Sequence, residues 1–239
     1  MGIMTEAIKQ NISAIANKEQ DIYAARFSAE ENKTRAITWE VLTQNLLQRY
    51  ISIEATVLDV ASGEGLFLKN IKAKRRIAVD VNPQVSDLSE LGIETFNISA
   101  LAIDGTFPLQ IDIIMVSNFL EHLENKGQVI ALLRAAYQAL KPGGRIIILQ
   151  PNIRFVKEAY WDYIDHHIAL TDKSLAEAVS ICNFEIERLV PRFLPYTARS
   201  TSVSILPERL LAFAVKVYIN CPLAWYIFGA QTLLIAKKK

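Results

Sequence analysis

The sequence lacks several features that would place it in a disulfide-bonded, metal-binding or nucleic-acid-binding class. Its 239 residues include only two cysteines, Cys182 and Cys221, which lie far apart without a paired spacing. We therefore expect small buried thiols in a reducing compartment and no disulfide framework. The three histidines follow no metal-ligand spacing, so no metal site is predicted. The net charge is only +1, so no overall positive field favours nucleic acid, and none is expected as a partner.

The sequence also lacks a secretory signal and a continuous membrane span. The N-terminal residues MGIMTEAIKQ do not have the basic-then-apolar order of a signal peptide. Residues 210–236 are mostly apolar, but Lys216, Asn220 and Pro222 interrupt them, whereas a spanning helix needs about 20 nearly continuous apolar residues. The prediction is a helix, a break and a final strand in a cytoplasmic protein. Contact with a membrane surface or a lipid-linked substrate stays open.

The middle of the chain alternates apolar strands with helical segments. Apolar residues make up 51% of the sequence and charged residues 21%, as in a globular protein. Five strands are predicted, at residues 55–60, 76–81, 93–96, 111–116 and 145–150. Because these strands are almost continuously apolar, they indicate a parallel sheet with helices on both faces.

Both ends of the chain differ from this pattern. Residues 1–52 are expected to form an N-terminal helical arm or lid, and residues 53–239 the main domain. Two late strands are predicted, at 184–190 and 231–236, and they are too far apart for a hairpin. We therefore expect a helical insert at about residues 195–229, on the side where a substrate would bind.

The stretch VLDVASGEGLFL, residues 57–68, predicts a strand, a tight glycine loop and a helix start. In open parallel sheets, ligands bind beyond the carboxyl ends of the strands. Asp80 ends the second strand at about 20 residues from Asp59, where an acid binds ribose hydroxyls, although NAD-binding folds carry such an acid too. Asp59 and Glu64 would repel a pyrophosphate, whereas they favour the ammonium and sulfonium groups of a cationic ligand.

The spacing of the glycines separates the two kinds of ligand. A dinucleotide fingerprint requires glycine at positions 61, 63 and 66, but the chain has Ala61 and Leu66. The alternative pattern, acid-x-G-x-G-x-G, is met at Asp59, Gly63 and Gly65 and departs only at Ala61. Ala61 adds one methyl group, so we expect it to narrow the loop without abolishing binding.

This pattern resembles the class I S-adenosylmethionine-dependent methyltransferases, and the resemblance continues through AVDVNP, NISA, SNFLEHL and LKPGGRIIILQPN. It implies S-adenosylmethionine (SAM) as cofactor. It also implies an α/β, Rossmann-like sheet of seven strands, mostly parallel with an antiparallel last strand and with helices on both faces. In NISA, Ser99 stands at the position where the family usually has an aspartate that contacts the adenine of SAM. The implied cofactor-binding residues are Asp59, Ala61, Ser62, Gly63, Gly65, Asp80, Val81, Ser99, Ala100, Ser117 and Asn118.

Other segments resemble a narrower bacterial methyltransferase group that is associated with glycosyltransferase and polysaccharide gene clusters. They are SNFLEHL, LQPNIRF, YWDYIDHHIALTDKSL, RFLPYT and FGAQTLLIAKK. This resemblance implies polysaccharide biosynthesis and a saccharide or lipid-linked saccharide acceptor.

Methyl transfer from a sulfonium requires donor and acceptor to be aligned, and a hydroxyl acceptor must also lose a proton. We predict His166 as the general base, then His167, then His122, because histidine titrates near neutrality. His166 and His167 are adjacent, so only one is expected to face the site. Arg26, in a possible lid, is expected to pair with the carboxylate of the donor, unless its segment is an ordinary amphipathic helix.

The sequence therefore predicts SAM-dependent O-methylation of a small or lipid-linked saccharide. Methylation of an aromatic or quinone-type precursor is an alternative within enzymes. A SAM-binding protein without turnover is the alternative outside them, favoured by the departures at Ala61 and Ser99.

Overall fold

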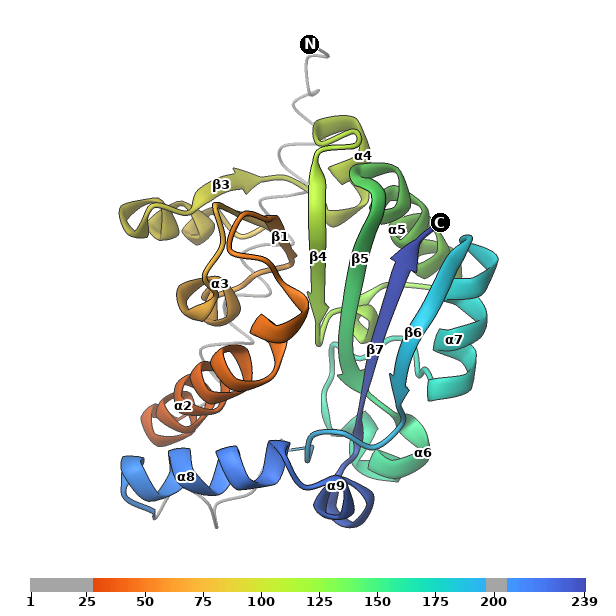
Figure 1. The fold of residues 1–239 in the computed structure, drawn as a ribbon. Helices are drawn as coiled ribbons and strands as arrows, with labels where there is room; N and C mark the ends of the chain where they lie inside the picture. Colours follow the sequence, from red (N-terminus) through yellow and green to blue (C-terminus); the bar gives the residue numbers. More distant parts are fainter. Residues whose placement is uncertain (1–27, 197–205) are drawn as a thin grey trace.

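A computed structural model describes residues 28–196 and 206–239. Its centre is a seven-stranded sheet with the strand order β3-β2-β1-β4-β5-β7-β6 (Figure 1). The strands are β1 Thr56–Val60, β2 Arg75–Asp80, β3 Glu94–Asn97, β4 Ile111–Ser117, β5 Leu140–Pro151, β6 Phe184–Val190 and β7 Gln231–Lys238.

The first five strands are parallel, whereas β7 runs antiparallel to both of its neighbours, β5 and β6. This arrangement confirms the predicted seven-stranded, mostly parallel sheet. The register pairs Asp59 of β1 with Met115 of β4, so both strands end at the same edge. Since the strand order reverses between β1 and β4, a ligand crevice is expected beyond their carboxyl ends.

Helices cover both faces of the sheet (Figure 1). The α-helices are α2 Ala29–Asn45, α3 Leu66–Asn70, α4 Ile103–Thr106, α5 Lys126–Ala139, α6 Ile153–Val156, α7 Asp172–Ile181, α8 Glu208–Ile219 and α9 Pro222–Phe228. Short 3₁₀ segments are η1 Leu47–Tyr50, η2 Pro83–Leu91, η3 Ala100–Ala102, η4 Leu120–His122 and η5 Lys157–Asp162. Ser28 begins α2 with a capping box to Glu31, which satisfies backbone N–H groups at the helix start.

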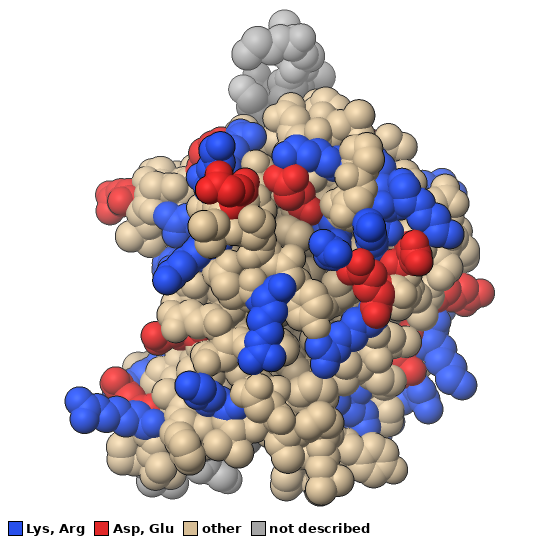
Figure 2. Space-filling model, in the orientation of Figure 1, with Lys and Arg blue, Asp and Glu red and all other residues tan. Residues whose placement is uncertain are grey.

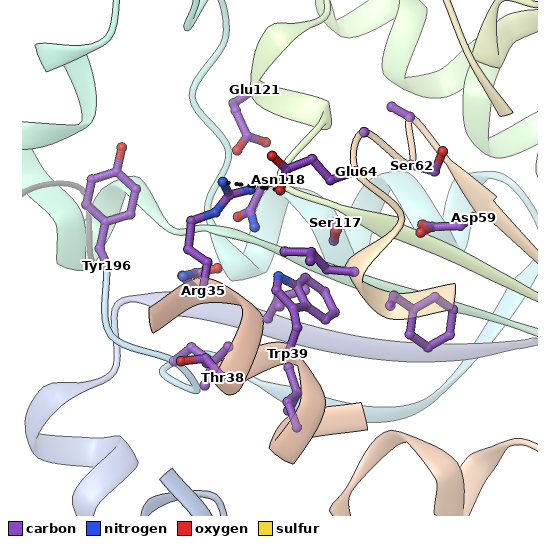
Figure 3. Close-up of a pocket in the computed structure, with 18 of the residues that line it drawn as sticks. Arg35, Thr38, Trp39, Asp59, Ser62, Glu64, Ser117, Asn118, Glu121 and Tyr196 are labelled. Atoms are coloured by element: carbon purple, nitrogen blue, oxygen red, sulfur yellow. Dashed lines mark ion pairs between the residues drawn. The ribbon is translucent and has the colours of Figure 1, made fainter. Parts of the chain in front are cut away.

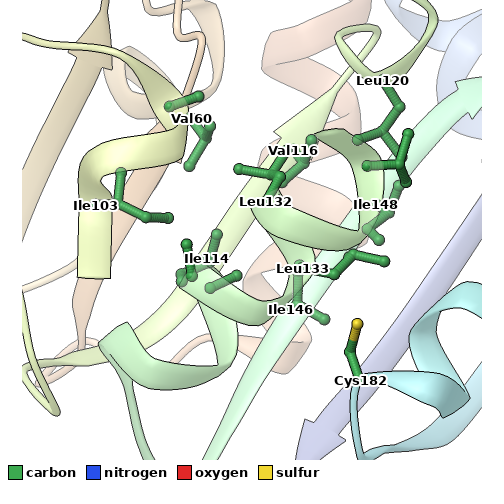
Figure 4. Packing of buried hydrophobic residues seen from close by; sticks show 14 of the residues in the cluster. Val60, Ile103, Ile114, Val116, Leu120, Leu132, Leu133, Ile146, Ile148 and Cys182 are labelled. Carbon is green, nitrogen blue, oxygen red and sulfur yellow. The ribbon is translucent and has the colours of Figure 1, made fainter. Parts of the chain in front are cut away.

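The two faces of the sheet bury separate hydrophobic clusters. On β4, Ile114 and Val116 pack into the cluster that contains α5 and α7 (Figure 4), whereas Ile113 and Met115 pack into the cluster that contains α2, α8 and α9. This alternation follows from the two-residue period of a strand, and it accounts for the continuous apolar sequence of β4.

One strand boundary differs from the sequence prediction. Strand β5 begins at Leu140, before the turn at Pro142, and its pairing with β4 shifts register between Ile111 and Ile113.

Between β6 and β7, the described chain forms the helices α8 and α9. None of the helices within residues 28–196 and 206–239 is by itself long and apolar enough to cross a membrane; α8 and α9 together reach that length and composition, but they bend by 99° at their junction.

Candidate active site

The loop after β1 takes a left-handed backbone at three positions, namely Ala61 (φ 54°), Gly63 (φ 52°) and Gly65 (φ 67°). Ala61 thus adopts a conformation that favours glycine, a point that the sequence left open. Gly65 precedes α3, and a Cβ there would lie 2.7 Å from Leu88 Cδ1. The small residues at alternate positions therefore form a tight turn, and this turn allows the backbone to lie close to a ligand bound beyond the end of β1.

Asp80 anchors this loop from the neighbouring strand. One carboxylate oxygen accepts a hydrogen bond from Gly63 N at 2.8 Å, and the other accepts one from Asn82 N at 2.8 Å. Asn97 on β3 donates through Nδ2 to the backbone oxygens of Asp80 (3.0 Å) and Val81 (2.8 Å). The ends of β1, β2 and β3 are therefore connected through one acidic residue.

The two acids at these strand ends lie in desolvated positions. Burial, together with the charge of Asp80, raises the pKa of Asp59 well above its usual value. Burial also raises the pKa of Asp80, against the lowering effect of its backbone hydrogen bonds. A ligand cation beside them would offset part of this desolvation and favour the ionised carboxylates.

A cavity of about 220 Å³ lies beside the loop, between α2, the ends of β1 and β4, and residues 194–196 (Figure 3). Of the predicted cofactor residues, those that line it are Asp59, Ala61, Ser62, Gly63, Ser117 and Asn118. Asp80, Val81, Ser99 and Ala100 lie at the ends of β2 and β3, outside the cavity lining that the described residues form. Ser99 caps η3, where its Oγ accepts a hydrogen bond from Leu101 N at 3.2 Å.

Polar atoms at this loop fit a polar, positively charged ligand. Asp59 Oδ1 and Ser62 Oγ are buried, and neither has a hydrogen-bond partner among the described residues. Buried polar atoms are normally paired, so both positions point to a bound group. A Cβ built on Gly63 meets no heavy atom of the described chain within 4 Å, which leaves space for a ligand against the backbone. This set of acid, hydroxyl and exposed glycine fits the ammonium and ribose groups of SAM.

Two of the three histidines face the cavity. His166 is buried, and its Nδ1 lies 2.8 Å from the backbone oxygen of Tyr160. Because a carbonyl only accepts, Nδ1 carries the proton in neutral His166 and the lone pair is on Nε2. His122 Nδ1 lies 3.0 Å from the backbone oxygen of Asp165, which assigns the same tautomer. The side chain of His167 is exposed and does not line this cavity.

Glu121 completes a cluster with the two histidines. It is 3% exposed, lines the cavity, and offers a carboxylate oxygen within 4.8 Å of one nitrogen each of His122 and His166. The sequence predicted no ligand set among the histidines. That expectation considered spacing along the chain, whereas the cluster joins the loop after β4 to the loop after η5.

The structure adds residues that the sequence pattern did not single out. Arg35 and Trp39, one turn apart on α2, both line the cavity, and Arg35 Nη1 lies 3.8 Å from Glu64 Oε2 (Figure 3). Their four-residue spacing is the signal that could have identified a shared helix face. Gln231 at the start of β7 also lines the cavity. Arg26, the predicted partner of the donor carboxylate, lies outside the described residues.

The aromatic residues after β5 divide between core and cavity. Tyr160 is buried and donates its hydroxyl to the backbone oxygen of Ile168 at 2.6 Å, and burial raises its pKa far above the usual value. Trp161 is 54% exposed. Of the aromatic residues at positions 160, 161 and 163, only Tyr163 lines the cavity.

Comparisons with known proteins concern the family and the fold. A model of the methyltransferase domain family matches residues 10–189. A search of curated proteins found no match to the chain. Among solved structures, a SAM-dependent methyltransferase from Archaeoglobus fulgidus is 22% identical (TM-score 0.53), with 84% of this chain and 94% of that chain covered. A SAM-dependent methyltransferase from Thermotoga maritima is 14% identical (TM-score 0.59), with 97% and 100% covered. Both likenesses concern the fold.

Proposed function

The chain belongs to the methyltransferase domain family, and on that premise we propose that it methylates a hydroxyl group of a lipid-linked saccharide. Its cofactor is SAM, which when bound supplies a methyl group on a positively charged sulfur. The chain's own residues must hold this donor, align the acceptor oxygen, exclude water and remove a proton.

We assign the donor contacts by charge. Asp80, at the end of β2, receives the ribose hydroxyls, and the Asp59 end of the loop receives the ammonium group, whose charge favours the ionised carboxylate. Arg35 lies in the cavity beside the loop and pairs with the donor carboxylate. This assignment gives Arg35 the role that the sequence suggested for Arg26.

We place proton removal at the cluster of Glu121, His122 and His166. These side chains line the same cavity as the glycine loop, so an acceptor there lies between the donor and the histidines. Since His122 and His166 are held through Nδ1 by backbone oxygens, each presents Nε2 in a fixed orientation.

The observation that carries the choice of a lipid-linked acceptor is an apolar surface on α8 and α9. Seven large side chains on these two helices are at least 50% exposed. They are Leu210, Phe213, Val217, Leu223, Tyr226, Ile227 and Phe228. Soluble monomers rarely expose so many apolar side chains together, and amphipathic helices of this kind lie in membrane interfaces. We call this set the α8–α9 apolar surface.

Its surroundings support a bilayer as the partner. The α8–α9 edge of the molecule is largely uncharged in this view and is bordered by basic side chains together with a few acidic ones (Figure 2). The basic side chains suit anionic lipid headgroups. Arg192 donates to the backbone oxygen of Gly229 at 2.8 Å, and Ala230 N donates to that of Leu194 at 2.8 Å. Because Leu194 lines the cavity, these bonds connect the end of α9 to the cavity wall. A membrane-bound acceptor would then present its saccharide to the cavity.

The catalytic part of the proposal is tested by paired histidine variants. We expect His166→Ala to retain SAM binding, measured by calorimetry, and to lose methyl transfer, whereas His167→Ala retains both because its side chain lies outside the cavity. Transfer of labelled methyl from SAM is measured on lipid-linked saccharide, water-soluble saccharide and quinone fractions. Label in the quinone fraction alone would favour the alternative acceptor. Bound SAM without transfer to any fraction would favour a non-catalytic binding protein.

The surface is tested by co-sedimentation with vesicles that contain anionic lipid. We expect Phe213→Glu combined with Phe228→Glu to abolish vesicle binding while SAM binding is retained. Ile181→Glu is the matched control, because Ile181 is 57% exposed on α7, outside the α8–α9 apolar surface. Equal vesicle binding by the wild type and the double variant would refute the role of this surface.

A further inference from the structure

The cluster at the histidine end of the cavity has the composition of a metal site. We propose that Glu121, His122 and His166 bind a divalent transition-metal ion that contacts an oxygen of the acceptor. Their three candidate ligand atoms lie within 4.8 Å of one another. Atoms that bind one ion at about 2.1 Å lie at most about 4.2 Å apart, so a pair of ligand atoms separated by 4.8 Å must move closer by at least about 0.6 Å on metal binding.

The hydrogen bonds of the two imidazoles match those that metal-bound histidines commonly make. His166 Nδ1 bonds the backbone oxygen of Tyr160, and His122 Nδ1 bonds the backbone oxygen of Asp165 and lies 3.2 Å from its Oδ2. Metal-ligating histidines commonly donate their other ring nitrogen to a carbonyl or a carboxylate, which fixes the ring and makes the ligand more basic. Both rings therefore present Nε2 as the ligand atom, with their centroids 5.1 Å apart.

The protein backbone brings the ligands together independently of an ion. His167 N donates to the backbone oxygen of Glu121 at 2.9 Å, and Ile168 N donates to the same oxygen at 3.4 Å. These bonds join the segment that carries Glu121 and His122 to the segment that carries His166. Such a preformed frame reduces the ordering cost of binding.

Two imidazoles and one carboxylate select the class of ion and leave room for substrate. Imidazole suits zinc, iron, cobalt and nickel more than magnesium or calcium, and three protein ligands leave coordination positions open. The cluster lines the cavity, so an acceptor hydroxyl can occupy an open position. Binding to the ion lowers the pKa of this hydroxyl, and its proton passes to water. The oxygen then forms the new C–O bond as the methyl–sulfur bond breaks, and the sulfur keeps the electron pair.

This inference rests on the proposed methyl transfer, and it makes His166 a metal ligand in place of a direct proton acceptor. The test uses the full chain, depleted of metal with a chelator and then titrated with Zn²⁺ by calorimetry and with Co²⁺ by absorption spectroscopy. We expect one ion per chain and cobalt ligand-field bands. His122→Ala and His166→Ala should each weaken binding by at least about 100-fold. Glu121→Gln should weaken it as well, while His167→Ala should leave it unchanged.

The outcomes separate the metal site from the methyl transfer. SAM binding by each variant shows that its fold is intact. Zn²⁺ binding that is equally tight in wild type and His166→Ala would overturn the site. Full methyl transfer by metal-depleted protein in chelator would overturn the role of the ion and leave the methyltransferase intact. One bound ion per chain without any methyl transfer would support the metal site and overturn the proposed methyltransferase activity.

Discussion

Replacing Ala61 by glycine should stabilise the protein. Ala61 has φ 54°, and an L-residue in the left-handed region costs about 1–2 kcal/mol, a cost that glycine does not have. Glycine also increases the conformational entropy of the unfolded chain, which lowers the free energy of unfolding by about 0.4–1 kcal/mol. Ala61 is half-buried, so the loss of its methyl group removes little packing. The midpoints of these two ranges give a net gain of about 0.8 kcal/mol in the free energy of unfolding.

The assay is thermal unfolding of the wild type and two variants. A gain of this size raises Tm by about 1–4 °C in a domain of this length. Ala36→Gly is the matched control, because Ala36 is exposed within α2, where the same substitution costs about 1 kcal/mol and lowers Tm. If Ala61→Gly lowers Tm as Ala36→Gly does, the left-handed conformation at Ala61 is wrong.

Two further predictions concern the acids beside this loop. Asp80→Ala removes the acceptor of Gly63 N and Asn82 N, and a charged hydrogen bond contributes about 1.5–3 kcal/mol, so calorimetry should show at least about tenfold weaker SAM binding; an unchanged Kd would contradict it. The pKa of Asp59 is raised in the folded protein, so the folded state retains its proton more tightly than the unfolded chain does. Stability without ligand should therefore fall as pH rises from about 4 towards the folded pKa, while SAM affinity should rise over the same interval because a cation favours the carboxylate. Asp59→Asn should flatten both profiles, measured by urea unfolding and calorimetry, and a slope that persists in this variant would assign the effect to another group.

The sheet could be predicted because its signals are local. Strand β6 occupies the predicted residues 184–190, and Asn183 before it has φ 65°, the left-handed conformation expected after a helix. Boundaries were less predictable where tertiary pairing decides them. Strand β5 begins at Leu140 because its first residue pairs with β4, and no local pattern indicates this pairing.

The candidate site likewise has a part that local sequence predicts and a part that depends on tertiary structure. The glycine loop is contiguous in the chain, so the spacing of its residues is enough to indicate a ligand site. The cluster of Glu121, His122 and His166 is formed by two segments that meet only in the folded chain. The types of residue in segments that are distant in sequence do not predict that the two segments will lie together. The adjacency of His166 and His167 predicted that only one of them would face inward, and the lining of the cavity identifies His166.

The position of β7 has a consequence for how the chain reaches this fold. In the described sheet, β6 pairs only with β7, and β7 also pairs with β5. During synthesis, β6 emerges from the ribosome before its pairing strand has been made, and the two helices α8 and α9 follow it. The two strands beyond β5, β7 and β6, therefore join the sheet last, through contacts that are distant in sequence and slow to form. Until β7 pairs with β5, the edge of β5 is open to the wrong partners, so the pairing of β7 determines when this edge is protected from aggregation.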